Sequence, residues 1–133
     1  MTLPELNLLV LKVRDVEACG AFYASLGLQL VRERHGRGPE HFSAKAGGRV
    51  LLELYPTSAN STAEHVRLGF VVDALDPAVS AAVQAGGTLI TQPRRGDVER
   101  RAVISDPEGH RVELVEALAG IELPAVGATA ARA

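Results

Sequence analysis

The sequence predicts an α+β fold built from two tandem βαβββ modules. Three observations lead to this prediction. First, short apolar runs typical of strands alternate with helical segments, in the same order in both halves of the chain. Second, the two halves superimpose at an offset of about 60 residues. Third, 47% hydrophobic and 23% charged residues is the composition of a globular domain.

The first module is expected over residues 6–56. Its first strand, at residues 6–13, is a short apolar run of the kind found in strands buried on both faces. Asp15 is a typical N-cap for the helix that follows, and Gly27 is placed to end that helix. Glycines separate the three further strands, which we expect at residues 28–34, 41–46 and 49–55.

The second module, residues 65–117, repeats this order. It begins with a strand at residues 67–72. Asp76 is expected to cap the helix, with Pro77 at its first position, and Gly86 to end it. Three strands are then expected, at residues 88–91, 101–105 and 111–116, with a type I turn, Asp106–Gly109, between the last two.

The remaining segments are a linker and a tail. Residues 56–63 are polar and join the modules within one domain, residues 1–117. Residues 118–133 form an alanine-rich tail, whose last residues we expect to be disordered or to lie on a neighbouring molecule.

Charge and composition exclude several classes of protein. The net charge of −2 gives no basic excess for nucleic-acid binding. Cys19 is the single cysteine, which excludes a disulfide scaffold and a cysteine-rich zinc module. No apolar run reaches the roughly 20 residues of a membrane helix, and the N-terminus does not have the pattern of a signal peptide. We therefore expect a cytoplasmic protein with neither a nucleic acid nor a membrane as partner.

Three segments share the pattern of one known superfamily. They are Val-Arg-Asp to Leu-Gly at residues 13–27, Val-Leu-Leu-Glu-Leu-Tyr at 50–55, and Asp-Pro-Glu-Gly-His-Arg-Val-Glu-Leu at 106–114. In these segments the chain resembles the vicinal oxygen chelate superfamily, which includes glyoxalase I, bleomycin-resistance proteins and extradiol dioxygenases. The resemblance covers residues 6–117. It implies curled mixed sheets that enclose a cleft, either within one chain or shared between two. It also implies a homodimer, because members of the superfamily usually assemble about a two-fold axis.

The resemblance also implies four metal-ligand positions, on the first and last strand of each module. They fall on Leu8, Glu53, Arg67 and Glu113. Leucine cannot ligate a metal, and arginine remains cationic and repels one. We therefore expect no metal cofactor at these positions. A divalent metal remains conceivable at a shifted site, with His65 joining the two glutamates.

The two glutamates are also the candidate catalytic residues. A carboxylate on an apolar strand needs either a partner or a function. Glu53 and Glu113 are therefore interpreted either as general-base or ligand-binding groups, or as structural acids held by an arginine. Arg67 either pairs with Glu113 or binds an anionic ligand. The candidate ligand-binding residues in the cleft are Leu8, Val10, Leu51, Arg67, Gly69 and Arg101, and Arg111 is a further candidate.

Other reactive side chains are given structural roles. Cys19 is expected to be a small buried hydrophobe. His41 is expected to face solvent, with proton transfer at the cleft mouth as the alternative. His35 is placed in a turn, and His110 is interpreted as structural. Arg94 and Arg95 are expected on a solvated loop.

Two main functions remain. The first is a metal-independent protein that binds a small organic molecule in an apolar cleft. The alternative is a glyoxalase-like lyase or isomerase, in which a glutamate abstracts a proton next to a carbonyl and Arg67 stabilises the enolate oxygen. Dioxygenase chemistry is less favoured. A subunit or regulatory domain without ligand chemistry is a third reading.

Overall fold

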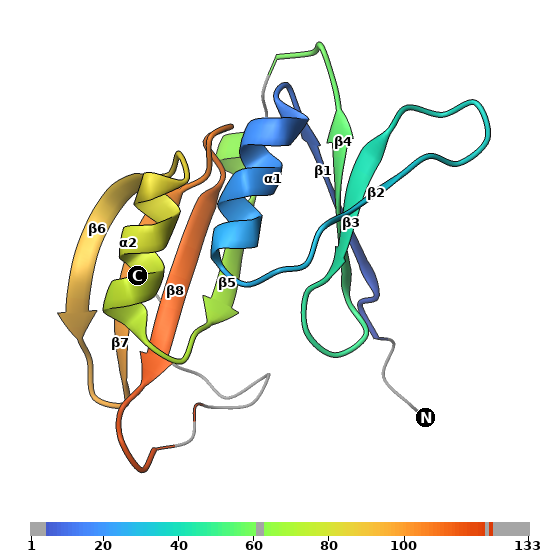
Figure 1. Ribbon diagram of the computed structural model, residues 1–133. Helices are drawn as coiled ribbons and strands as arrows, with labels where there is room; N and C mark the ends of the chain where they lie inside the picture. Colours follow the sequence, from blue (N-terminus) through green and yellow to red (C-terminus); the bar gives the residue numbers. More distant parts are fainter. Residues whose placement is uncertain (1–4, 61–62, 122, 124–133) are drawn as a thin grey trace.

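The computed structural model describes residues 5–60, 63–121 and 123. In the first half of the chain, four strands form sheet A, in the spatial order β1-β4-β3-β2 (Figure 1). Strands β1 and β4 are parallel, and the other neighbours are antiparallel. The elements are β1 (Leu8–Val13), α1 (Val16–Ser25), β2 (Val31–Glu33), β3 (His41–Lys45) and β4 (Leu51–Pro56).

The second half repeats this arrangement as sheet B, in the order β5-β8-β7-β6. Leu8 pairs with Leu51 in sheet A, and Arg67 pairs with Arg111 in sheet B, so Leu8 and Arg67 occupy equivalent positions. The predicted α+β fold of two βαβββ modules is confirmed. The elements are η1 (Ala63–His65), β5 (Arg67–Val71), α2 (Leu75–Gln84), β6 (Thr88–Arg95), β7 (Glu99–Ser105) and β8 (Arg111–Ala117).

The helices cover the core faces of the sheets. Helix α2 lies over one face of sheet B, and α1 lies between the two sheets (Figure 1). Residues from both helices and both sheets share one apolar core, which includes Phe22, Leu54, Leu75 and Ile104. Neither helix in the described ranges is long and apolar enough to span a membrane.

Helix α1 begins as the sequence predicts. The Asp15 carboxylate accepts a hydrogen bond from the backbone N–H of Ala18 at 2.9 Å, which satisfies one of the unpaired N–H groups of the first turn. The helix ends at Ser25, and Gly27 follows with φ of 102°, a conformation that favours glycine.

Helix α2 begins differently from the prediction. Its N-cap is Ala74, and Asp76 lies inside the first turn, where it accepts two hydrogen bonds from Arg100 at 2.9 and 3.1 Å. The capping hydrogen bond comes instead from β8, because the carboxylate of Glu116 accepts from the backbone N–H of Leu75 at 2.7 Å. A side chain distant in the sequence therefore replaces the local cap.

A buried polar network joins the two modules. Tyr23 on α1 donates to Oδ2 of Asp106 at 2.7 Å, and the Nδ1 atom of His110 lies 2.7 Å from the same oxygen. Backbone N–H groups of residues 108–110 donate to the other oxygen, Oδ1, each at 2.9 Å. Burial raises the pKa of the Asp106 carboxyl, but the hydrogen bonds from His110 and Tyr23 outweigh burial and hold this pKa below its ordinary value.

Several local expectations can now be compared with the structure. His110 is buried in this network and is structural, as expected. Cys19 is a buried core residue, and burial, together with the nearby negative charge of Asp106, raises the pKa of its thiol to about 12. Asp106 and Gly109 close the predicted turn with a 3.0 Å backbone hydrogen bond. The expectation for the end of the tail, residues 124–133, lies outside the described residues.

Candidate functional site

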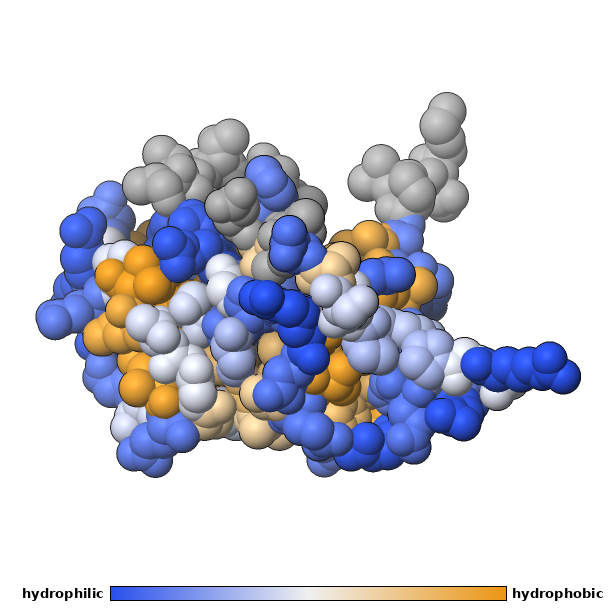
Figure 2. Space-filling view, turned by 90° about the horizontal axis from the view of Figure 1, so that it is seen from above, coloured by the Kyte–Doolittle hydropathy of each residue, from blue (hydrophilic) through white to orange (hydrophobic). Residues whose placement is uncertain are grey.

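The face of sheet A turned away from the core exposes apolar side chains, and hydrophobic residues also reach the surface among hydrophilic ones where the molecule is seen from above (Figure 2). On β4 the buried residues alternate with Leu51 and Glu53, which point to the opposite face. Their register partners on β1 are Leu8 and Val10. Leu8 is 45% exposed, Val10 38% and Leu51 37%. Three large apolar residues therefore lie beside a carboxylate on an open sheet face.

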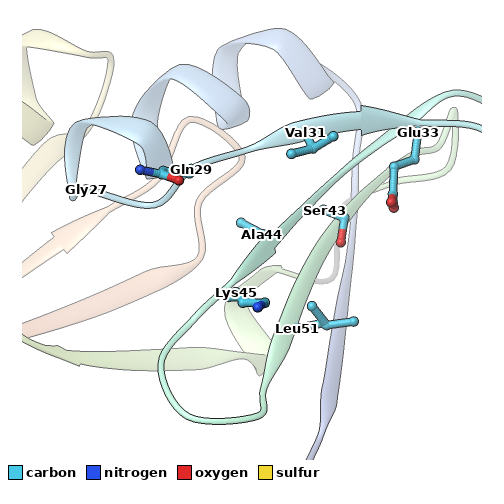
Figure 3. Close-up of a pocket in the computed structure, with 8 residues that line it drawn as sticks. All are labelled: Gly27, Gln29, Val31, Glu33, Ser43, Ala44, Lys45 and Leu51. Carbon is cyan, nitrogen blue, oxygen red and sulfur yellow. The ribbon is translucent and has the colours of Figure 1, made fainter.

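A pocket of about 530 Å³ borders this face. Its walls come from the segment after α1 and from β2, β3 and β4 (Figure 3). Val31 and Leu51 give it apolar walls, and Glu33 and Lys45 give it charged ones. The Glu33 side chain extends from β2 toward the neighbouring strands (Figure 3). The pocket thus combines an apolar lining with a few charged groups, as small-molecule sites do.

A cluster of two glutamates and two histidines lies at one end of this face. It consists of Glu33, His35, His41 and Glu53, and one potential ligand atom from each lies within 4.8 Å of all the others. The Nε2 atom of His41 is 3.5 Å from Oε1 of Glu33 and 3.6 Å from Oε2 of Glu53. The Nε2 atom of His35 is 3.8 Å from Oε1 of Glu33.

His41 does not face solvent, contrary to the prediction. The hairpin of β2 and β3 brings Glu33 opposite His41, and the imidazole is only 1% exposed. Its Nδ1 atom lies 3.2 Å from the carbonyl oxygen of Pro39, and Tyr55 stacks on the ring at 4.0 Å and an angle of 11°. Loss of hydration, then the charges of Glu53 and Glu33, raise the pKa of Tyr55. His35 begins the turn in which it was expected, with its carbonyl accepting from Gly38 at 2.9 Å.

Sheet B has a different charge pattern at the equivalent positions. Glu113 is buried between two guanidinium groups, 3.7 Å from Nη1 of Arg67 and 3.5 Å from Nε of Arg101. Arg101 also donates to Glu99 at 2.5 Å. The pairing of Arg67 with Glu113 agrees with one of the two sequence interpretations. Arg67 is nevertheless half-exposed, so this pair is not a fully buried one.

A second pocket, of about 440 Å³, lies over these residues. Arg67, Arg101, Arg94 and Arg95 line it together with Glu99. The prediction that Arg94 and Arg95 lie on a loop is wrong, because β6 continues to residue 95 and pairs both of them with β7. The arginines outnumber the glutamates that line this pocket or border it, so an anionic group is attracted to it.

The four metal positions implied by the family resemblance do not fit a metal ion. Leu8 has no donor atom, and the guanidinium of Arg67 already pairs with Glu113. The shifted site with His65 is not formed either. His65 lies in the 3₁₀ turn η1, outside the strand whose alternation was assumed, and it is absent from the single cluster of potential ligands found among the described residues.

The remaining candidates lie on the same faces. Gly69 is the register partner of Glu113, and a Cβ atom there would meet no atom within 4 Å, so this position is open. Arg111 is exposed and lies opposite Arg67 in the register of β5 and β8. The sequence reasoning missed Glu33. The sequence does show a glutamate just before the glycine-containing turn that leads to His41. Without the register of this hairpin, however, nothing indicates that Glu33 lies opposite His41.

The fold and its faces can be compared with known proteins. A family model described as a glyoxalase-like domain matches residues 8–115. A glyoxalase/bleomycin resistance protein/dioxygenase family enzyme from Burkholderia phytofirmans is 25% identical, with a TM-score of 0.70 over 86% of this chain and 100% of that chain. No curated protein matches the sequence significantly.

Two further solved structures are similar in fold. A glyoxalase-related enzyme from Fulvimarina pelagi is 23% identical, with a TM-score of 0.69 over 86% of this chain and 88% of that chain. An antibiotic binding protein from a Streptomyces species is 21% identical, with a TM-score of 0.69 over 89% of this chain and 99% of that chain. One fold thus occurs both in proteins described as enzymes and in one described as a binding protein.

Proposed function

Given that the chain belongs to the glyoxalase-like domain family, whose model it matches over residues 8–115, we propose that it binds a small organic molecule on the open faces of its sheets, without a metal at the family's four positions. The exposed apolar row of Leu8, Val10 and Leu51 carries this proposal. Leu51 also lines the pocket of about 530 Å³, and apolar walls with a few charged groups are typical of small-molecule sites.

The charges of sheet B indicate the chemistry of the ligand. Arg67 and Arg101 lie at a pocket with an excess of arginine, and the half-exposed guanidinium of Arg67 is accessible to solvent. Guanidinium groups bind carboxylates and phosphates through paired hydrogen bonds. The proposed ligand therefore has an apolar body, which packs on sheet A, and an acidic group, which binds at the arginines of sheet B.

A homodimer brings these two faces together. Helix α1 packs on the core face of sheet A and lies between the two sheets (Figure 1). The open face of sheet A is therefore turned away from sheet B of the same chain. In the two-fold dimer that we propose, sheet A of one chain faces sheet B of its partner, so that each cleft receives both an apolar and a basic wall. Light scattering is expected to give the mass of a dimer, and a stable monomer that binds ligand would exclude the shared cleft.

A thermal-shift screen tests the binding function. The library should contain small organic acids and, because one structural neighbour is described as an antibiotic binding protein, natural-product antibiotics. A stabilising compound is then titrated by calorimetry into the wild type and into Leu51→Asp. We expect the charge at Leu51 to weaken binding by more than tenfold, since it places an ion on the apolar wall.

Val83→Asp is the matched control. Val83 is 41% exposed, close to the value for Leu51, but it lies on α2, away from the open sheet faces. This variant should bind as the wild type does. Equal binding by Leu51→Asp and the wild type would locate the ligand elsewhere and refute the proposed site.

The alternative enzyme function is favoured by one contact, that between Glu53 and His41. Oε2 of Glu53 lies 3.6 Å from Nε2 of the buried His41, so a shift of a few tenths of an ångström would bring the two groups within the hydrogen-bond distance that proton transfer requires. Glu113 suits a base less well, because its oxygens are engaged by two guanidinium groups. As a lyase or isomerase, the protein should incorporate solvent deuterium next to the carbonyl of a bound compound. That exchange should be lost in Glu53→Gln while binding remains.

A further inference from the structure

We propose that Glu33, His35, His41 and Glu53 bind one divalent transition-metal ion. Of these four, only Glu53 is among the positions to which the family resemblance assigns metal ligands. The site is built within module one alone, from β2, β3, β4 and the β2–β3 loop. It does not depend on the proposed binding of a small molecule, because metal binding can be measured without any ligand.

The spacing of the donor atoms suits a common centre. Ligand atoms around a tetrahedral zinc ion lie about 2.0–2.2 Å from it, so neighbouring ligand atoms are about 3.4 Å apart. Nε2 of His41 lies 3.5 Å from the Glu33 carboxylate and 3.6 Å from that of Glu53. Nε2 of His35 lies 3.8 Å from Glu33. The remaining pairs of donor atoms lie within 4.8 Å of each other, so side-chain shifts of up to about 1 Å would bring all four around one ion.

His41 has the orientation of a metal-binding histidine. Its Nδ1 lies 3.2 Å from the carbonyl oxygen of Pro39, so Nδ1 carries the proton and donates it there. In this tautomer of the neutral imidazole, Nε2 is the nitrogen with the lone pair that a metal ion binds. This nitrogen is buried, has no hydrogen-bond partner among the described residues, and is directed between the two carboxylates. Ligating histidines commonly donate their second ring N–H to a backbone carbonyl, which fixes the tautomer and the ring orientation.

The charges of the cluster also call for a cation. Among the residues that the structure describes, the ion-pair partners of Glu33 and Glu53 are imidazoles, with no lysine or arginine among them. In sheet B the equivalent carboxylate, Glu113, lies beside Arg101, and Arg101 occupies the ladder position that His41 has in sheet A. Arginine thus supplies positive charge to one module, whereas the other has two carboxylates and two imidazoles, which bind a metal ion in their neutral form. Their charge of −2 matches a divalent ion.

Two imidazoles and two carboxylates define the class of metal. This donor set suits zinc and its first-row neighbours, and it lacks the all-oxygen character that calcium and magnesium prefer. The site borders the pocket of about 530 Å³, because Glu33 belongs to both. A metal bound here is therefore open on the pocket side.

Zinc binding by the full-length, untagged chain tests the proposal. The protein is stripped with a chelator, titrated with zinc chloride by calorimetry, and analysed for metal after gel filtration. We expect one zinc ion per chain. Glu33→Gln and His35→Ala should each weaken binding by at least about tenfold. His35 is an exposed side chain, so its removal should leave the fold intact even where a variant of the buried His41 does not fold.

His65→Gln is the matched control, because this histidine lies on η1, outside the cluster. It should bind zinc as the wild type does. Cobalt(II) gives a second readout, since bound cobalt should develop visible absorption that Glu33→Gln abolishes. A wild-type chain that retains less than one equivalent of zinc after gel filtration would overturn the proposal, as would equal affinity in the wild type and Glu33→Gln.

Discussion

Removing one hydroxyl from the network between the modules should measurably destabilise the fold. Tyr23→Phe keeps the buried ring and deletes only the hydroxyl that donates to Asp106 at 2.7 Å. A hydrogen bond to a charged group contributes about 1.5–3 kcal/mol. His110 and three backbone N–H groups still bind the carboxylate, so it is not left without donors. We therefore expect Tyr23→Phe to lower the free energy of unfolding by about 1.5–2 kcal/mol, near the lower end of that range.

The effect should depend on pH in a defined direction. Because the pKa of Asp106 is lowered in the folded state, its contribution to stability is complete above its ordinary pKa and is lost as the pH falls through the folded value. The difference between the wild type and Tyr23→Phe should therefore be constant above about pH 5 and shrink below about pH 3. The remainder is the contribution of a hydrogen bond to a neutral acid, about 1 kcal/mol.

Urea unfolding followed by far-ultraviolet circular dichroism gives both quantities, since the chain has no tryptophan to serve as a fluorescent probe. For a domain of this size the loss corresponds to a fall in Tm of about 5–10 °C. Tyr55→Phe is the control, because the Tyr55 hydroxyl makes no hydrogen bond within the described residues. A change below about 0.5 kcal/mol for Tyr23→Phe, or a difference unaffected by acid, would refute the role of this network.

Three further outcomes are expected. Cys19 should resist alkylation at pH 8 until the protein is unfolded, because its side chain is buried and its thiol pKa is raised to about 12. Labelling of the folded protein at the rate of a free thiol would contradict this burial. Gly87→Ala should lower the free energy of unfolding in urea by about 1–3 kcal/mol, because the added Cβ would lie 2.6 Å from a ring carbon of Phe22. An unchanged free energy of unfolding would mean that the residues around the end of the helix repack. Arg67→Ala should change the free energy of unfolding by less than about 1 kcal/mol, because the arginine is half-exposed and lies 3.7 Å from Glu113. A loss of about 3 kcal/mol or more would instead indicate a buried ion pair.

Where a signal was local, the sequence predicted the structure. The cap at Asp15 and the turn from Asp106 to Gly109 each depend on residues within four positions of one another, so the residue types were sufficient. The duplication was visible because each module repeats the same order of apolar runs and glycines. Leu51 and Glu53 lie on the face of β4 opposite its buried residues, as the strand period of two requires, since that period depends only on the backbone.

Where two elements meet, only the tertiary structure determines which side chains contact each other. Asp76 has the residue type of a cap, but Glu116 on a distant strand reaches the helix start and takes that role. His41 was expected in solvent because a histidine at the start of a strand more commonly faces solvent. The hairpin register and the stacking of Tyr55 bury it.

The sequence by itself determined the module order and the apolar faces, because these follow from residue type and period. The four metal positions came from the family resemblance, and the residue types at two of them rule out ligands. The sequence did not determine which charged side chains contact one another. Glu33 and Glu53 are 20 positions apart in the chain, yet both approach one imidazole nitrogen, while Glu113 is enclosed by arginines from two other strands. Such encounters depend on strand order and register, which are set by the packing of the whole sheet rather than by any local segment.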